Sequence, residues 1–141
     1  AGALQDDVNV MDVVIAMSAC TDSNYGSQYQ LPGTFAPTAS YNLVARAVEV
    51  AKEQGTPVRV GSVISSDVFY GDNPESSKAW RKMGVLCVEM ECAALFIVSS
   101  IRGKRAGAIM NWGDMNETIQ TACDAVRLLI GQDKANSEQG G

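Results

Sequence analysis

Histidine is absent from the sequence, and its absence excludes several kinds of chemistry. The chain cannot supply the base of a Ser-His or Cys-His pair, and it lacks the commonest protein ligand of zinc. The four cysteines form no C-x-x-C pair and lie in apolar surroundings, so we interpret them as reduced core thiols. The sequence therefore predicts no metal site and no disulfide framework.

Basic residues are also scarce, with 11 Lys and Arg against 16 Asp and Glu and a net charge of −5. This balance argues against nucleic acid and anionic membranes as partners, because both are bound by clustered cations. No apolar run approaches the roughly 20 residues that span a bilayer, and the first residues, AGALQDDVNV, do not resemble a signal peptide. We expect a cytoplasmic protein.

The residues that are present indicate one α/β domain. Of the 141 residues, 46% are hydrophobic, and short β-branched runs alternate with helical periods, as in βαβ units. The pattern predicts a mainly parallel or mixed sheet flanked by helices. The expected strands are Val8–Cys20, Pro57–Ser65, Val85–Val88 and Arg105–Asn111, and the expected helices are Ser40–Gln54, Glu75–Met83, Glu89–Ile101 and Asn116–Ile130.

Local signals add detail to this predicted arrangement of strands and helices. Ser40 is a plausible N-cap and Gly55 a plausible terminator of the helix between them. The strand at Val8 begins so early that a sheet of four strands and a sheet lacking earlier strands are equally compatible with the sequence. We assign residues 1–130 to the domain and expect a disordered tail at 131–141. The last helix is expected to turn inward the residues Ile119, Ala122, Cys123, Val126, Leu129 and Ile130.

Four polar stretches follow predicted strands: ACTDS, SSDVFY, VEMEC and NWGDMN. Ligands of α/β proteins bind at the carboxyl ends of parallel strands, so these stretches are the candidates for a site. None contains a dinucleotide or nucleoside-triphosphate glycine motif. Taken alone, Glu91 could be a first-turn helix carboxylate, Asp114 an N-cap, and Asp22 and Asp67 turn formers whose side chains hold loop backbone.

In combination, five stretches resemble a known family. SACTDS, FAPTASY, VRVGSVISSDVFY, MGVLCVEMECAAL and the strand ending in Asp114 are similar, in order and spacing, to the C-terminal part of bacterial-type purine nucleoside phosphorylases and the related uridine phosphorylases. The resemblance runs from Gly2 to Asp114. It implies phosphorolysis of a nucleoside, purine favoured, to the free base and ribose 1-phosphate, with inorganic phosphate as co-substrate and no other cofactor.

The resemblance also implies roles for individual residues. Glu91 would accept hydrogen bonds from both ribose hydroxyls, since a carboxylate has two oxygens for two vicinal donors. Met90 would lie against the sugar. Phe69 would stack near the base, in a pocket also lined by Val88 and Glu89. Asp114 would be the acid that neutralises charge on the leaving purine.

Phosphate-binding residues are not among the matching motifs, and the resemblance places them upstream of residue 1. The chain would then be part of a longer enzyme, or would be completed by an N-terminal chain, and copies are expected to associate. The open alternatives are a uridine phosphorylase, a non-catalytic nucleoside-binding or structural subunit, and a nucleosidase that uses water.

Overall fold

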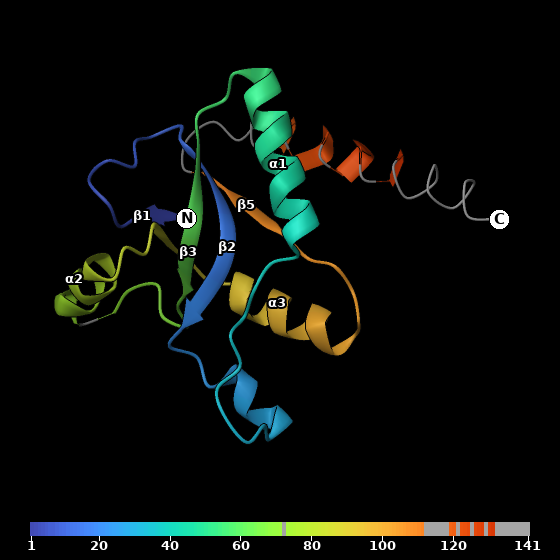
Figure 1. Ribbon diagram of the computed structural model, residues 1–141. Coiled ribbons are helices and arrows are strands. Elements are labelled where there is room, and N and C mark those ends of the chain that lie inside the picture. The colour runs from blue at the N-terminus through green and yellow to red at the C-terminus, as the bar shows by residue number, and fades with distance from the viewer. Residues whose placement is uncertain (72, 112–118, 121, 125, 129, 132–141) are drawn as a thin grey trace.

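The computed structural model describes residues 1–71, 73–111, 119–120, 122–124, 126–128 and 130–131. Strands and helices alternate along most of this length, as the apolar pattern predicts (Figure 1). The elements are β1 (Gly2–Ala3), β2 (Val13–Thr21), the 3-10 helix η1 (Tyr25–Tyr29), α1 (Tyr41–Gln54), β3 (Val58–Ser65), α2 (Pro74–Lys82), β4 (Cys87–Glu89), α3 (Cys92–Ile101) and β5 (Ala108–Met110).

The strands form one mixed sheet in the order β1-β4-β3-β2-β5. β3 pairs in parallel with both β2 and β4. The outer strands β1 and β5 are antiparallel to their neighbours, β4 and β2. The expected α/β class with a parallel or mixed sheet is confirmed. The described residues contribute five strands, of which β1 has only two residues.

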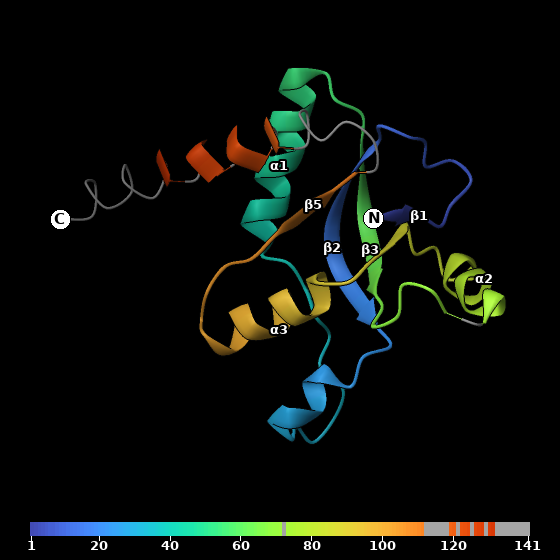
Figure 2. The ribbon, with the colours of Figure 1, turned by 180° about the vertical axis from the view of Figure 1, so that it is seen from behind.

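The core lies around β2. Four consecutive residues of this strand, Val13 to Ala16, are buried, which means that both faces of the strand are covered. Helices α1 and α3 both pack against β2. Figure 1, and Figure 2 from behind, show both helices on one side of β2 and β3, with α2 on the other side. Among the residues that the structure describes, Phe96 of α3 is the largest fully buried side chain. These contacts fix α3 against the sheet.

Helix α1 follows its sequence signals closely. It begins after Ser40 and ends at Gly55, whose φ of 69° is the left-handed conformation that glycine adopts without strain. Val44, Ala47 and Ala51 are buried on its inner face, as the helical period predicts.

None of the helices in the described ranges is long and apolar enough to cross a bilayer.

Four predicted elements begin at least two residues later than expected. The strand expected from Val8 begins at Val13, because residues 5–12 form turns closed by hydrogen bonds such as Asn9 N–H to the Asp12 carboxylate at 2.9 Å. The strand expected at Val85 is Cys87–Glu89, and the one expected at Arg105 is only Ala108–Met110. The helix expected from Glu89 begins at Cys92, because Glu89 still pairs with β3.

The last predicted helix is only partly described. Its described residues between 119 and 131 have helical backbone, but Ile119, Cys123, Val126 and Ile130 are exposed, contrary to the expected inward face. Ala122 is half-buried as expected, and Leu129 lies outside the described residues. The predicted tail at 131–141 lies outside them too, apart from Gly131, which is helical. Of the exposed side chains, Val126 and Ile130 border a cavity next to α1 and β5, together with Ala122.

Candidate functional site

The carboxyl ends of β3 and β4 lie side by side and bring two of the polar stretches together. Ile64 pairs with Val88, and Ser65 pairs with Glu89, in parallel register. The Ser66 N–H then donates to the Glu89 carbonyl at 2.9 Å, so the contact continues past the end of β3. SSDVFY and VEMEC therefore leave the sheet at one edge, where α/β folds place their ligands.

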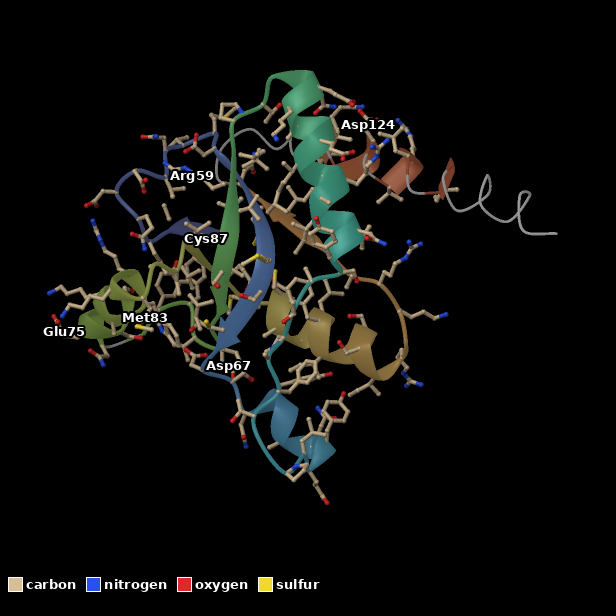
Figure 3. All side chains as sticks on the ribbon, in the orientation of Figure 1. Arg59, Asp67, Glu75, Met83, Cys87 and Asp124 are labelled. Carbon is tan, nitrogen blue, oxygen red and sulfur yellow. The ribbon has the colours of Figure 1, made fainter. Side chains whose placement is uncertain are left out.

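A third polar stretch reaches the same edge from β2. The Asp22 carboxylate accepts hydrogen bonds from the Ser66 hydroxyl at 2.8 Å and from the Asp67 N–H at 3.0 Å. Figure 3 shows Asp67 at the ends of β2 and β3. The expectation that the Asp22 side chain holds loop backbone is confirmed, and the loop it holds is the one that carries Phe69.

Phe69 and Val88 line the same cavity, which has a volume of about 570 Å³. Phe69 comes from the loop after β3 and is 75% exposed, and its ring packs edge-on against Tyr70 with the centroids 4.8 Å apart. Val88 comes from β4, and Trp80 of α2 contributes to the wall. The structure thus brings two of the predicted base-binding residues to one hollow with an available aromatic face.

Glu89 is buried, only 8% exposed, and its carboxylate is engaged inside the protein. It accepts hydrogen bonds from the N–H groups of Glu91 at 2.7 Å and Cys92 at 2.8 Å, and from the Ser65 hydroxyl. The Ser65 oxygen in turn accepts from the Ala93 N–H at 2.8 Å. Glu89 and Ser65 together therefore satisfy the N–H groups at the beginning of α3, which a helix leaves without internal partners.

Glu91 occupies the N-cap position of α3, and its side chain is exposed. Its carboxylate accepts only a long hydrogen bond from the Met90 N–H, at 3.3 Å, among the contacts of this side chain that the structure records. Met90 is itself 43% exposed. Neither residue lines the cavity at Phe69. The predicted sugar-binding residues therefore follow β4 directly after the base-binding Val88, but they face different surroundings.

Two of the cysteines, Cys87 of β4 and Cys92 of α3, are buried near Glu89. Burial, reinforced by the nearby Glu89, raises the pKa of the Cys87 thiol to about 12. The same causes raise the pKa of the Cys92 thiol, which packs 3.8 Å from the Met110 sulfur. Both are therefore protonated and unreactive at neutral pH. The prediction of core thiols is right for these two, while Cys20 is only half-buried. It is wrong for Cys123, which is exposed.

Ser65 is the member of this arrangement that sequence reasoning did not single out. The only signal was its position as the first serine of SSDVFY, and its role depends on the β3–β4 register. The predicted acid Asp114 lies outside the described residues, as does Gly113 before it.

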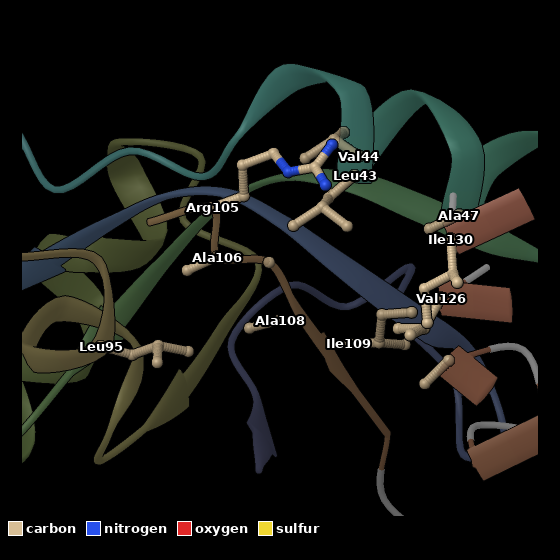
Figure 4. Close-up of a pocket in the computed structure, with 12 residues that line it drawn as sticks. Leu43, Val44, Ala47, Leu95, Arg105, Ala106, Ala108, Ile109, Val126 and Ile130 are labelled. Atoms are coloured by element: carbon tan, nitrogen blue, oxygen red, sulfur yellow. The ribbon is translucent and has the colours of Figure 1, made fainter. Parts of the chain in front are cut away.

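A second cavity, of about 490 Å³, lies away from the predicted residues. Its walls come from α1, α3, β5 and the last helical residues, and Figure 4 shows mostly aliphatic side chains facing it, with Arg105 at its border. None of the described residues that line it is a carboxylate, and Arg105 is the one charged side chain among them. A cavity lined in this way offers few polar groups to orient a polar ligand.

Comparison with known proteins gives a consistent result. The sequence profile of the Phosphorylase superfamily matches residues 1–131. The purine nucleoside phosphorylase DeoD-type of Clostridium beijerinckii is 47% identical over 113 residues, which are 80% of this chain and 48% of that protein. The protein of the same name from Geobacillus sp. (strain WCH70) is 43% identical over 113 residues, again 80% and 48%. The one from Bacillus cereus is 40% identical over 141 residues, 88% and 60%. The chain thus spans about half the length of the curated relatives it matches.

Proposed function

The chain belongs to the phosphorylase superfamily, and from this premise we propose that it carries the sugar- and base-binding part of a nucleoside phosphorylase. The proposed reaction cleaves a purine nucleoside with inorganic phosphate to the free base and ribose 1-phosphate. The observation that supports it most is the meeting of SSDVFY and VEMEC at the ends of β3 and β4. The similarity to proteins named as purine nucleoside phosphorylases supports the choice of purine.

We assign the ribose to Glu91. Its exposed carboxylate at the beginning of α3 has two oxygens, which suit the two vicinal hydroxyls of a ribose. Met90, next to it and partly exposed, offers an apolar surface for the sugar ring. The positive end of the α3 dipole is already compensated by Glu89, so the Glu91 carboxylate remains available to a ligand.

We assign the base to the cavity lined by Phe69 and Val88. A flat aromatic ring with a large exposed face can stack on a purine, and an aliphatic wall makes no hydrogen-bond demand on the base. Asp114 is proposed as the acid. A protonated carboxyl beside the imidazole ring of the leaving purine would neutralise the negative charge that develops as the glycosidic bond breaks.

Phosphate is proposed as the only co-substrate, without an organic cofactor. Its binding residues are proposed to lie in a part of the enzyme that precedes the segment matched here, in the same chain or in a complementing one. Association of copies and a cytoplasmic location belong to the same proposal.

The test is purine release from inosine by the complete gene product, with and without phosphate, in the wild type and in Glu91→Ala. Loss of two hydrogen bonds to a charged group, each worth about 1.5–3 kcal/mol, should lower kcat/KM by roughly 100-fold or more. Glu53→Ala is the matched control, because Glu53 is an exposed glutamate of α1 far along the chain from the site.

Each alternative gives a different result in this assay. Release that does not depend on phosphate would identify a nucleosidase, and faster cleavage of uridine than of inosine would identify a uridine phosphorylase. Binding of inosine without turnover would identify a non-catalytic subunit. Unchanged kinetics in Glu91→Ala would show that the ribose assignment is wrong.

A further inference from the structure

The buried pair of Ser65 and Glu89 joins three elements at the edge of the site. Ser65 is the last residue of β3, Glu89 is the last residue of β4, and both contact the beginning of α3. We propose that this pair is a positioning device that fixes the direction of the Glu91 side chain, and that Glu89 does not itself bind the nucleoside. The inference rests on the proposed function of Glu91.

The contacts of Glu89 leave it little capacity for a ligand. Its carboxylate, 8% exposed, receives three protein donors: the Glu91 N–H, the Cys92 N–H and the Ser65 hydroxyl. A carboxylate has about four acceptor sites, so most are used. A nucleoside that bound here would have to displace hydrogen bonds that already compensate a buried carboxylate, which is costly.

The same contacts fix the backbone that carries Glu91. The N–H of Glu91 is held by Glu89 at 2.7 Å, and the two following N–H groups are held by Glu89 and Ser65. Glu91 is therefore, with Met90, one of two exposed residues between a strand end and a helix that are tied to each other. Because its side chain is exposed, packing does not fix its direction, and the clamped backbone must do so.

A glutamine at position 89 would disturb this arrangement without removing bulk. The Ser65 oxygen accepts from the Ala93 N–H, so its hydroxyl hydrogen donates to the Glu89 carboxylate. Both N–H groups face one Glu89 oxygen and Ser65 faces the other. With an amide, therefore, either the Ser65 hydroxyl hydrogen or both N–H groups lose their acceptor. An amide oxygen that keeps both N–H groups is neutral, and hydrogen bonds to it are only about half as strong as those to a carboxylate. The backbone at Glu91 is then held less tightly.

The proposal is tested by comparing two substrates in the complete gene product. Inosine carries both ribose hydroxyls, and 2′,3′-dideoxyinosine carries neither, so only inosine reports the direction of Glu91. We expect Glu89→Gln to lower kcat/KM for inosine by about tenfold to 100-fold, and for dideoxyinosine by less than about threefold. In the Glu91→Ala background, Glu89→Gln should leave the ratio of the two substrates unchanged within about twofold.

A matched control separates positioning from loss of stability. The Ser40 hydroxyl anchors the beginning of α1 by accepting from the Ala106 N–H at 3.0 Å, so Ser40→Ala loosens a helix that is not at the site. It should affect the two substrates equally. Equal losses on both substrates in Glu89→Gln would overturn the positioning role, as would a further loss of substrate discrimination in the Glu91→Ala background.

The outcome for Glu91 alone keeps the two proposals apart. If Glu91→Ala lowers the preference for inosine and Glu89→Gln does not, the positioning role is wrong and the ribose assignment stands. If Glu91→Ala itself does not change the preference, the ribose assignment is wrong.

Amide hydrogen exchange of this chain gives an independent measurement. The N–H groups of Glu91, Cys92 and Ala93 should be protected, and should exchange faster in Glu89→Gln. Unprotected amides in the wild type would show that Glu89 and Ser65 do not hold these N–H groups.

Discussion

Ser65→Ala removes both hydrogen bonds made by one buried hydroxyl. The Ala93 N–H loses its acceptor, and the buried carboxylate of Glu89 loses a donor. A buried group left unsatisfied costs about 1–3 kcal/mol, and a hydrogen bond to a charged group contributes about 1.5–3 kcal/mol. Because the two bonds share one hydroxyl, the costs overlap, and we expect the free energy of unfolding to fall by about 2–4 kcal/mol.

Urea unfolding followed by far-UV circular dichroism measures this loss. With a urea dependence of about 2 kcal/mol per molar, the midpoint should fall by roughly 1–2 M. Ser62→Ala is the matched control, because Ser62 lies in the same strand and its half-buried hydroxyl makes one hydrogen bond, to the Ser18 hydroxyl at 2.8 Å. It should cost only about 1 kcal/mol. Equal losses in the two variants would refute the idea that the Ser65 hydroxyl serves both partners.

Two further predictions concern the thiols and the loop at the site. Because burial raises the pKa of Cys87 to about 12, its contribution to stability is complete below the ordinary thiol pKa of about 8.5 and is lost as the pH rises toward 12, by up to about 1.4 kcal/mol per pH unit. The free energy of unfolding, measured with urea between about pH 8 and pH 10, should therefore fall less steeply with pH in Cys87→Ala than in the wild type. In Cys123→Ala it should fall as steeply as in the wild type, since Cys123 is exposed. Asp22→Ala removes the acceptor of the Asp67 N–H, so this amide should exchange its hydrogen faster. The KM for inosine should also rise, because the loop that carries Phe69 loosens. An unaltered exchange rate at Asp67 would show that Asp22 does not hold this loop.

The two glutamates of VEMEC show that the motif alone does not predict which carboxylate is buried and which is exposed. Glu89 and Glu91 are two positions apart, and in a continuing strand both would point to the same face. The chain instead leaves β4 after Glu89 and begins α3 at Cys92. One carboxylate therefore turns inward to hold the helix, and the other remains outside.

The sequence by itself determined the α/β class, the helix between Ser40 and Gly55, and the family. These depend on signals that can be read along the chain: an apolar period, a capping residue, a glycine, or short motifs in a fixed order and spacing. Tertiary structure decided what such signals cannot carry. The pairing of Ser65 with Glu89 needs the register of two strands separated by α2. The burial of Glu89 likewise follows from contacts between distant segments, because hydrogen-bond partners and burial are set by what packs across the sheet.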